Sequence, residues 1–183
     1  MRSLWKATAS LPEFPELVGD VRTDVLIIGG GIAGILTAYL LHEKGVKYVL
    51  VEKGRICSGT TGNTTAKITF QHGLIYDKIL KSDGTEAARK YLAANRAAFD
   101  KYAELCGKTD CDYEIKDNYV YSTDDRRKLE KEVEALEKIG YIADLCENVP
   151  LPIKTVGAVK FPDQAQFNPL KFLSSVAEGL NIY

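Results

Sequence analysis

The chain has 183 residues, of which 45% are hydrophobic and 27% are charged, proportions that are usual for a soluble globular protein. Its net charge is −1 and its pI is about 6.2, so no basic field favours nucleic acid as the main ligand. No apolar run approaches the roughly 18 residues of a membrane span. The N-terminus carries prolines and a glutamate where a signal peptide needs an apolar core. These features predict a cytoplasmic protein.

The four cysteines form no C-x-x-C pair, and only two histidines are present to complete a metal site. We therefore expect no metal site in this chain. Because the cytosol is reducing, we expect structural thiols at all four positions. These positions are Cys57, Cys106, Cys111 and Cys146.

Residues 1–20 predict an extended arm, because Pro12 and Pro15 disfavour a helix. Trp5 and Phe14 are the aromatic residues of this arm. Isolated aromatic residues in such a segment anchor it to the body of the protein more often than they contact a ligand, so we expect both to be anchors.

A strand, a helix and a second strand are predicted directly after the arm. Val25–Ile28 is a short apolar run typical of a parallel strand that is buried on both faces. The apolar residues of Ile32–Lys44 recur every three or four positions and predict a helix, which Gly45 is placed to end. Tyr48–Val51 predicts the second strand, and the whole segment constitutes a right-handed βαβ unit.

The middle of the chain predicts a mixed α+β region. Residues 54–73 are rich in glycine, threonine and serine and predict a loop. Asp83 and Glu86 resemble a capping box, which would begin a long helix that continues to about Cys106. Alternating aromatic residues over 113–121 predict a β-hairpin with its turn at Lys116-Asp117-Asn118.

The last third of the chain predicts two helices and two strands. Thr123 is expected to cap a charged, solvent-facing helix that runs to Ile139 and stops at Gly140. The other predicted elements are strands at Ile142–Cys146 and Val156–Phe161, a helix from Asn168 to about Glu178, and the apolar start of a strand at Leu180–Tyr183.

Gly29, Gly31 and Gly34 form the pattern G-x-G-x-x-G between the first strand and the helix. Gly29 permits a sharp turn, Gly31 lets a pyrophosphate approach the backbone, and Gly34 lets the helix and strand pack closely. The amides of Ile32, Ala33 and Gly34 lie at the positive end of the helix dipole, where phosphates bind. The pattern predicts a site for an ADP-containing dinucleotide.

Glu52 follows at the tip of the second strand, 23 residues after Gly29. A carboxylate at this position accepts hydrogen bonds from ribose hydroxyls and repels a 2′-phosphate. NAD and FAD share the ADP half, so this fingerprint alone leaves both cofactors open.

The stretch from Asp24 to Lys67, which includes DVLIIGGGIAG and GTTGNTTAK, resembles the N-terminus of FAD-dependent oxidoreductases of the D-amino-acid oxidase type. Glycine oxidase and sarcosine oxidase belong to this family. The segment SGTTGNTTAKITFQHGLIYDKI is similar to a subgroup with a C-terminal Rieske [2Fe–2S] domain, and QAQFNPLKFL is a second matching landmark. The resemblance implies an α/β fold, with an incomplete Rossmann-like FAD-binding βαβ domain and an inserted α+β substrate-binding layer.

The resemblance also assigns roles to residues of this chain. Gly29, Gly31, Ile32, Ala33 and Gly34 would hold the pyrophosphate, and Glu52 and Lys53 would lie around the adenosine ribose. The loop that follows would pass along the pyrophosphate and ribityl chain, with contacts from Ser58, Gly59, Thr60, Thr61, Thr64 and Thr65.

Other residues have competing interpretations. Lys67 matches the place of a flavin-side cation that would stabilise the reduced flavin, or it is an ordinary exposed lysine. Cys57 is expected to be a small buried residue rather than a covalent flavin anchor. Three tyrosines either line a substrate face or pack in the sheet, which we favour: Tyr113, Tyr119 and Tyr121.

The expected domains are residues 1–80, the first part of the FAD-binding domain; residues 81–165, the substrate-binding layer; and residues 166–183, a truncated return helix. No second glycine cluster follows residue 165, and no C-H…C-H pair is present for a Rieske cluster. We therefore expect the N-terminal portion of a longer flavoenzyme, with weak FAD affinity and no turnover by itself. A [2Fe–2S] cluster would belong to a region beyond Tyr183.

The implied activity is oxidation of a C–N bond in an amine or amino acid by hydride transfer to flavin N5. A small-molecule substrate and a redox partner protein are the expected partners, with no nucleic acid and no membrane. The alternatives are a flavin electron-transfer module coupled to a Rieske centre and an NAD-linked dehydrogenase.

Overall fold

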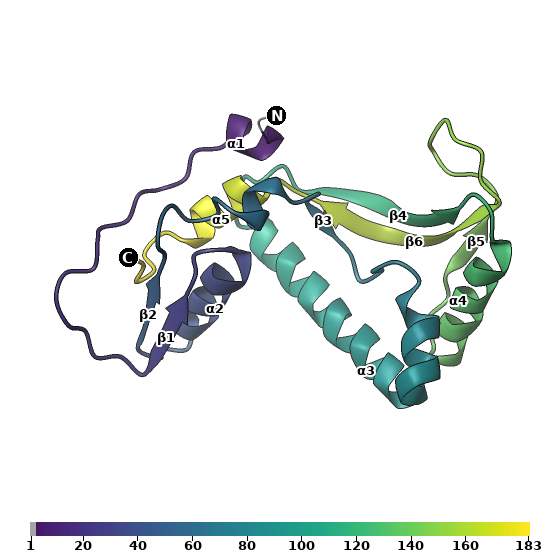
Figure 1. Cartoon of the computed structure of the whole chain (residues 1–183), viewed down its shortest axis with the longest axis horizontal. Helices are drawn as coiled ribbons and strands as arrows, with labels where there is room; N and C mark the ends of the chain where they lie inside the picture. Colours follow the sequence, from purple (N-terminus) through teal and green to yellow (C-terminus); the bar gives the residue numbers. More distant parts are fainter. Residues whose placement is uncertain (1–2) are drawn as a thin grey trace. The chain divides into compact units, whose positions relative to one another are not determined.

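The computed structural model describes residues 3–183, which divide into two compact units (Figure 1). The first unit comprises the described part of Met1–Ala66 together with Cys106–Asp112 and Phe167–Tyr183. The second unit comprises Lys67–Leu105 and Tyr113–Gln166. The chain therefore leaves the first unit and returns to it. The assignment of chain segments to a cofactor domain and a substrate layer stays a prediction.

The predicted βαβ segment forms in the first unit. Strand β1 (Val25–Ile28) pairs in parallel with β2 (Tyr48–Val51), and helix α2 (Ile32–Glu43) connects them. Gly45 adopts a φ of 66° directly after the helix, a conformation that favours glycine. Both strands have the predicted bounds, and the helix ends one residue earlier than predicted.

The C-terminal residues add to the same sheet. Ile182 forms a parallel bridge with Leu50. Backbone hydrogen bonds join Leu50 N to Asn181 O (3.0 Å), Tyr183 N to Leu50 O (2.9 Å) and Glu52 N to Tyr183 O (2.8 Å). Helix α5 (Pro169–Val176) precedes this segment and starts where predicted, after an N-cap formed by the Asn168 side chain, but it ends two residues before the predicted Glu178. The expected strand start at Leu180–Tyr183 is confirmed.

The expectation that β1 is buried on both faces is wrong. Leu26 is 57% exposed and Ile28 is 81% exposed, whereas Val49 and Leu50 of β2 are buried. The reason is that α2 covers one face of β1, and no described element covers the side chains of Leu26 and Ile28.

The N-terminal arm also differs from the prediction. Leu4–Thr8 form a short helix, α1, ahead of the two prolines, where an extended chain was expected. The indole N–H of Trp5 donates to Thr64 O at 2.8 Å, which fixes the helix to the body of the unit. Thus Trp5 is an anchor, as expected, and the rest of the arm is extended.

The second unit contains a four-stranded sheet around one long strand. Strand β6 (Gly157–Gln166) pairs antiparallel with β3 (Lys67–Ile68), β4 (Glu114–Ser122) and β5 (Asp144–Cys146). The β6 strand is longer than the predicted Val156–Phe161, and β5 is shorter than the predicted Ile142–Cys146. The predicted loop at 54–73 also contains β3 and a short 3₁₀ helix, η1 (Thr60–Asn63).

The predicted hairpin at 113–121 is wrong, because β4 is one continuous strand. Lys116 pairs with Gln164 and Asn118 with Phe161, so Asp117 opposes two residues of β6, Pro162 and Asp163. This is a β-bulge, in which a proline without an amide hydrogen is tolerated. The polar run that predicted a turn therefore marks a bulge in the partner strand.

Two helices cover the sheet of the second unit. Helix α3 (Ile75–Cys106) is broken by a non-helical residue, Gly84, so its later part begins where the capping box predicted and its first part was missed. Helix α4 (Arg126–Lys138) is capped by Asp125, whose carboxylate accepts from Lys128 N. The cap is therefore two residues later than the predicted Thr123.

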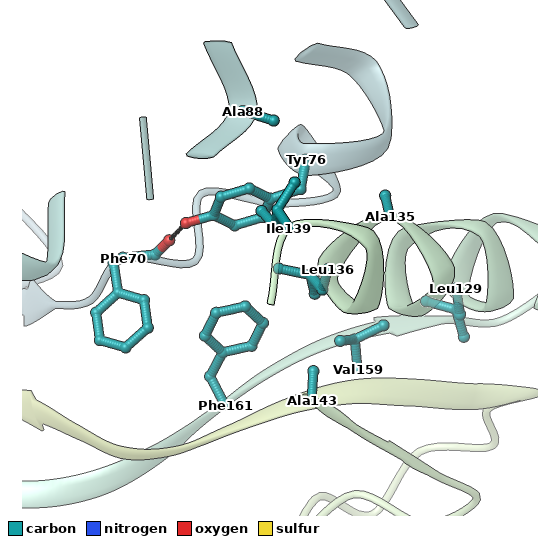
Figure 2. Close-up of a cluster of buried hydrophobic side chains, with 10 residues drawn as sticks. All are labelled: Phe70, Tyr76, Ala88, Leu129, Ala135, Leu136, Ile139, Ala143, Val159 and Phe161. Carbon is teal, nitrogen blue, oxygen red and sulfur yellow. Dashed lines mark hydrogen bonds between the residues drawn. The ribbon is translucent and has the colours of Figure 1, made fainter. Parts of the chain in front are cut away.

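The core of the second unit lies between these helices and β6 (Figure 2). Phe161 of β6 stacks on Tyr141, with ring centroids 4.7 Å apart, and lies parallel to the ring of Tyr76 at 6.2 Å. The Tyr76 hydroxyl donates a hydrogen bond to the Phe70 carbonyl. Full burial of such a ring stabilises the fold by about 2–3 kcal/mol, so this cluster fixes α3 and α4 on the sheet.

Glu132 is an exception to the solvent exposure expected for the charged residues of α4, because its side chain is completely buried. Its two carboxylate oxygens accept from Tyr76 N at 2.9 Å and Asp77 N at 2.8 Å. These amides lie in the first turn of α3, where the helix itself supplies no acceptor. Burial raises the pKa of Glu132, and the hydrogen bonds from the amides of α3 oppose this rise. The carboxylate caps α3 from a different helix.

We predict that Glu132→Leu lowers the free energy of unfolding by about 3 kcal/mol, because two buried amides lose their acceptor. Glu132→Gln keeps one acceptor oxygen and is expected to cost about half as much. Urea denaturation followed by circular dichroism measures both changes. Glu134→Gln, on the exposed side of α4, is the matched control and should change stability by less than about 0.5 kcal/mol. A Glu132→Leu variant as stable as this control would contradict the capping role.

Candidate functional site

The glycine turn joins β1 to the start of α2 through one close backbone contact. Gly29 has a φ of 108°, which disfavours residues with a side chain. A Cβ on Gly34 would lie 2.0 Å from the Gly29 carbonyl oxygen. Gly31 is the N-cap residue of α2, so the amides of the first helical turn follow it directly. This geometry presents the helix N-terminus without any intervening side chain from the turn.

Glu52 connects the end of β2 to the glycine turn. Its Oε2 accepts a hydrogen bond from Gly30 N at 2.7 Å, and its Oε1 accepts from Gly54 N at 3.1 Å. Each carboxylate oxygen has capacity for a further hydrogen bond. The side chain therefore holds the two loops together and still presents acceptors.

The predicted threonine loop reaches the same helix N-terminus. Thr61 is buried in η1, and its hydroxyl accepts from Ile32 N at 3.1 Å. Cys57 N donates to Gly30 O at 2.8 Å, which fixes the start of this loop against the glycine turn. The structure thus brings together three predicted parts of the site: the glycine turn, Glu52 and Thr61.

The remaining predicted residues of the loop do not contact the N-terminus of α2 through a hydrogen bond described above, and most of them are exposed. Thr64 is half-buried, and its carbonyl accepts the Trp5 indole N–H. The carbonyl of Ser58 accepts from Lys6 Nζ at 2.8 Å. The other predicted residues are exposed: Ala33, Lys53, Ser58, Gly59, Thr60 and Thr65.

Lys67 and the three tyrosines belong to the second unit. Lys67 is exposed at the start of β3 and lines a small pocket of about 60 Å³, and its role beside a flavin stays a prediction. Tyr119 and Tyr121 alternate with Val120 along β4. Tyr121 is 45% exposed. The Lys160 ammonium lies over the Tyr119 ring, 6.0 Å from the ring centroid. The two tyrosines lie on the face of β4 opposite Val120, which pairs with the core residue Val159.

Cys57 is buried and has a φ of 57°, an uncommon value for a residue with a side chain. Burial, with a smaller contribution from the Glu52 charge, raises the pKa of its thiol to about 12. A thiol with this pKa is a poor nucleophile at neutral pH. The geometry agrees with a small buried residue rather than a covalent anchor.

Sequence reasoning missed several residues that line pockets at the site. One pocket of about 240 Å³ is bordered by Glu52 and by the arm residue Phe14, and a second of about 430 Å³ is bordered by Lys6 and Arg55. Arg55 and Ile56 line both pockets. The only sequence signal was the aromatic residues of the arm, which were interpreted as anchors.

A family model described as "FAD dependent oxidoreductase", DAO, matches residues 24–181. The chain belongs to the DAO family of FAD-dependent oxidoreductases. This assignment confirms the predicted resemblance, and the family it names depends on FAD rather than NAD. The arm before Asp24 lies outside the matched segment.

Three known proteins show what the chain is similar to. It is 40% identical over 180 residues to YhfW of Bacillus subtilis (strain 168), named as a Rieske 2Fe-2S iron-sulfur protein, over 96% of this chain and 35% of that protein. The structure of L-amino acid deaminase from Proteus vulgaris matches with a TM-score of 0.69 at 20% identity, over 95% of this chain and 42% of that one. Glycine oxidase from Bacillus cereus ATCC 14579 matches with a TM-score of 0.62 at 24% identity, over 88% and 46%.

The chain corresponds to only part of each of these relatives. The likeness to the two solved structures shows the fold, and the chain spans about a third of the length of YhfW. No helix among residues 3–183 is both long and apolar enough to cross a membrane.

The residues present fit the ADP half of FAD, the cofactor of the DAO family. The close approach of Gly34 to Gly29 O leaves backbone amides in the place where phosphates bind in such turns. Glu52 provides acceptors beside these amides, as the ribose hydroxyls require.

We predict that Gly34→Ala lowers the free energy of unfolding by about 3 kcal/mol or more, because a methyl group would overlap the Gly29 carbonyl. Gly59→Ala is the matched control, since its Cβ would meet nothing within 4 Å. It should change stability by less than about 0.5 kcal/mol. Thermal unfolding of the two variants without cofactor measures the difference, and equal midpoints would show that the turn is not constrained by this contact.

We predict that Cys57 reacts very slowly with iodoacetamide in the folded protein. With a pKa of about 12, about one molecule in ten thousand carries the thiolate at about pH 8. The half-buried Cys146 should be labelled before the buried Cys57. Peptide mapping by mass spectrometry after timed labelling measures both rates, and the urea-unfolded chain serves as the reference. Labelling of Cys57 as fast in the folded as in the unfolded chain would contradict the prediction.

Proposed function

We propose that this chain holds the ADP half of FAD in an oxidoreductase that oxidises a C–N bond of an amine or amino acid. The observation that supports it most directly is the joining of Glu52 to the glycine turn at the N-terminus of α2. The carboxylate and the helix amides are the two groups that an adenosine diphosphate needs, and they lie beside each other.

The chemistry of the two groups defines the ligand. The amides of Ile32, Ala33 and Gly34 favour the diphosphate through the positive end of the helix dipole. The Ile32 amide donates to the Thr61 hydroxyl in the structure, so a phosphate oxygen would replace that hydroxyl as its acceptor. Glu52 accepts hydrogen bonds from the ribose hydroxyls, and its charge repels a 2′-phosphate. The site therefore favours ADP-type cofactors without a 2′-phosphate.

The substrate class is proposed from the relatives. The two structural relatives are named as an L-amino acid deaminase and a glycine oxidase, both of which act on amino acids. FAD held at this site would supply a hydride acceptor for the substrate carbon. The part played by this chain is to hold the cofactor in one orientation and to keep water from the phosphates and ribose.

A second function is favoured by the similarity to YhfW, which is named as a Rieske iron–sulfur protein. In that case the flavin would exchange electrons with an iron–sulfur centre. The substrates and electron acceptor of the whole protein are proposals in either case, because the chain spans 35% of this relative.

We predict that Glu52→Gln weakens ADP and FAD binding by about tenfold or more, because a charged acceptor for the ribose hydroxyls is lost. Fluorescence titration of FAD and calorimetric titration of ADP measure the two affinities. Glu43→Gln, exposed at the end of α2, is the matched control and should bind as the unaltered chain does. Equal affinities of the two variants, or tighter binding of 2′-phospho-ADP than of ADP, would sink the assignment of Glu52.

The proposed reaction is tested by mixing the FAD-loaded protein anaerobically with a panel of amines and amino acids. Loss of the flavin's visible absorbance with one of them would support C–N oxidation. Bleaching by a reduced iron–sulfur protein, with no response to any amine, would instead support the electron-transfer function.

A further inference from the structure

The N-terminal arm is held by three side-chain hydrogen bonds, two to the loop that follows Glu52 and one to Asn168. Trp5 Nε1 donates to Thr64 O at 2.8 Å, and Lys6 Nζ donates to Ser58 O at 2.8 Å. The hydroxyl of Thr8 accepts from Asn168 Nδ2 at 3.2 Å, next to the start of α5. The short helix α1 is thus held at both the loop and the C-terminal segment of the first unit.

The extended part of the arm then borders the pocket that contains Glu52. Pro12, Glu13 and Phe14 form one side of this pocket of about 240 Å³. The pocket is also lined by Glu52, the Gly54–Ile56 segment, and the C-terminal residues Ile182 and Tyr183. Phe14 is half-buried, so part of its ring remains accessible to a ligand.

The pocket beside the arm contains an acceptor and an aromatic ring, the two kinds of group that a purine nucleoside needs. Glu52 supplies the acceptor for ribose inside the pocket, and the aromatic ring of Phe14 borders the same space. Lys6 and Arg55 line the neighbouring pocket, and Arg55 lines both. Arg55 is paired with Glu13 and lies beside Glu52, so the aromatic ring and the ribose acceptor, rather than net charge, favour a purine nucleoside here.

We infer that the arm is the outer wall of the adenosine site, with Phe14 packing against the purine ring and the anchored Trp5 holding the wall in place. This inference rests on the proposed function, and it adds a contact from a segment that precedes the residues matched by the family model. Arg55 and Glu13 form an ion pair of 3.0 Å across the pocket, but both side chains are mostly exposed. Such a pair contributes little, so the affinity depends on the aromatic wall.

The first test compares ADP, FAD and FMN binding to the Phe14→Ala variant and to the unaltered chain. Loss of one aromatic stacking surface should weaken ADP and FAD binding by about tenfold each. FMN has no adenosine, so its binding should not change. Leu17→Ala is the matched control, because Leu17 is a 41% exposed residue of the same arm outside the pocket. Its affinities for all three ligands should equal those of the unaltered chain.

The outcomes separate this inference from the proposed function. If the unaltered chain binds neither ADP nor FAD, the proposed function fails. If it binds both and Phe14→Ala binds them as tightly as Leu17→Ala does, the arm is not a wall of the site. A loss of FMN binding equal to the loss of ADP binding would also overturn the inference, because it would indicate a general disturbance of the fold.

Three conservative variants distinguish loss of the ligand contact from unfolding of the chain. Phe14→Tyr keeps an aromatic ring and should restore ADP affinity to within about twofold, whereas Phe14→Leu keeps apolar volume only and should not. Trp5→Phe removes the hydrogen bond to Thr64 while keeping an aromatic ring, and should speed FAD release in a stopped-flow chase. Equal ADP affinity of the tyrosine and leucine variants, or an unchanged FAD release rate in Trp5→Phe, would contradict the role of the arm.

Discussion

The close approach of α2 to the carbonyl of Gly29 is the contact on which the first unit depends. A single methyl group at Gly34 would lie 2.0 Å from that oxygen, so the helix can start where it does only if the position has no side chain. Because the helix starts there, Gly30 N reaches Glu52 and Ile32 N reaches Thr61. One steric constraint therefore brings together three separate parts of the sequence: the glycine turn, Glu52 and Thr61.

The parts of the fold that the sequence predicted are those in which local pattern and tertiary environment agree. Val25–Ile28 and Tyr48–Val51 are apolar runs of strand length with a glycine turn between them, and no other structure satisfies all three signals. The failures have a common physical cause. The Lys116–Asn118 run has turn-forming residues, but the extra residue that disturbs the pairing lies in β6, at Pro162 and Asp163. At the bulge, the pairing of β4 with β6 joins residues more than 40 positions apart in the sequence, and neither segment alone carries a pattern that predicts it.

The candidate site divides in the same way. Gly29, Gly34 and Glu52 were predictable, because backbone conformation and ribose chemistry restrict the residue type at each position. The contribution of the arm was not, because Phe14 reaches the pocket through tertiary folding of a segment without periodicity. The buried Glu132 was missed for a related reason. In sequence it is one of several charges on α4, and only the packing of α3 shows that its carboxylate serves as a helix cap.

Glu132 and Glu52 illustrate two uses of the same chemical group in one chain. Glu132 has no exposed surface, and its oxygens accept from amides of α3, so it acts on stability alone. Glu52 also accepts from two backbone amides, but it lines a pocket and retains acceptor capacity. A carboxylate that first organises its own loops and then meets a ligand is already oriented when the ligand arrives, so little conformational entropy remains to be lost on binding. Under the proposed function, this pre-organisation would couple the folding of the glycine turn to nucleotide affinity, since any change that loosens the turn would also move Glu52.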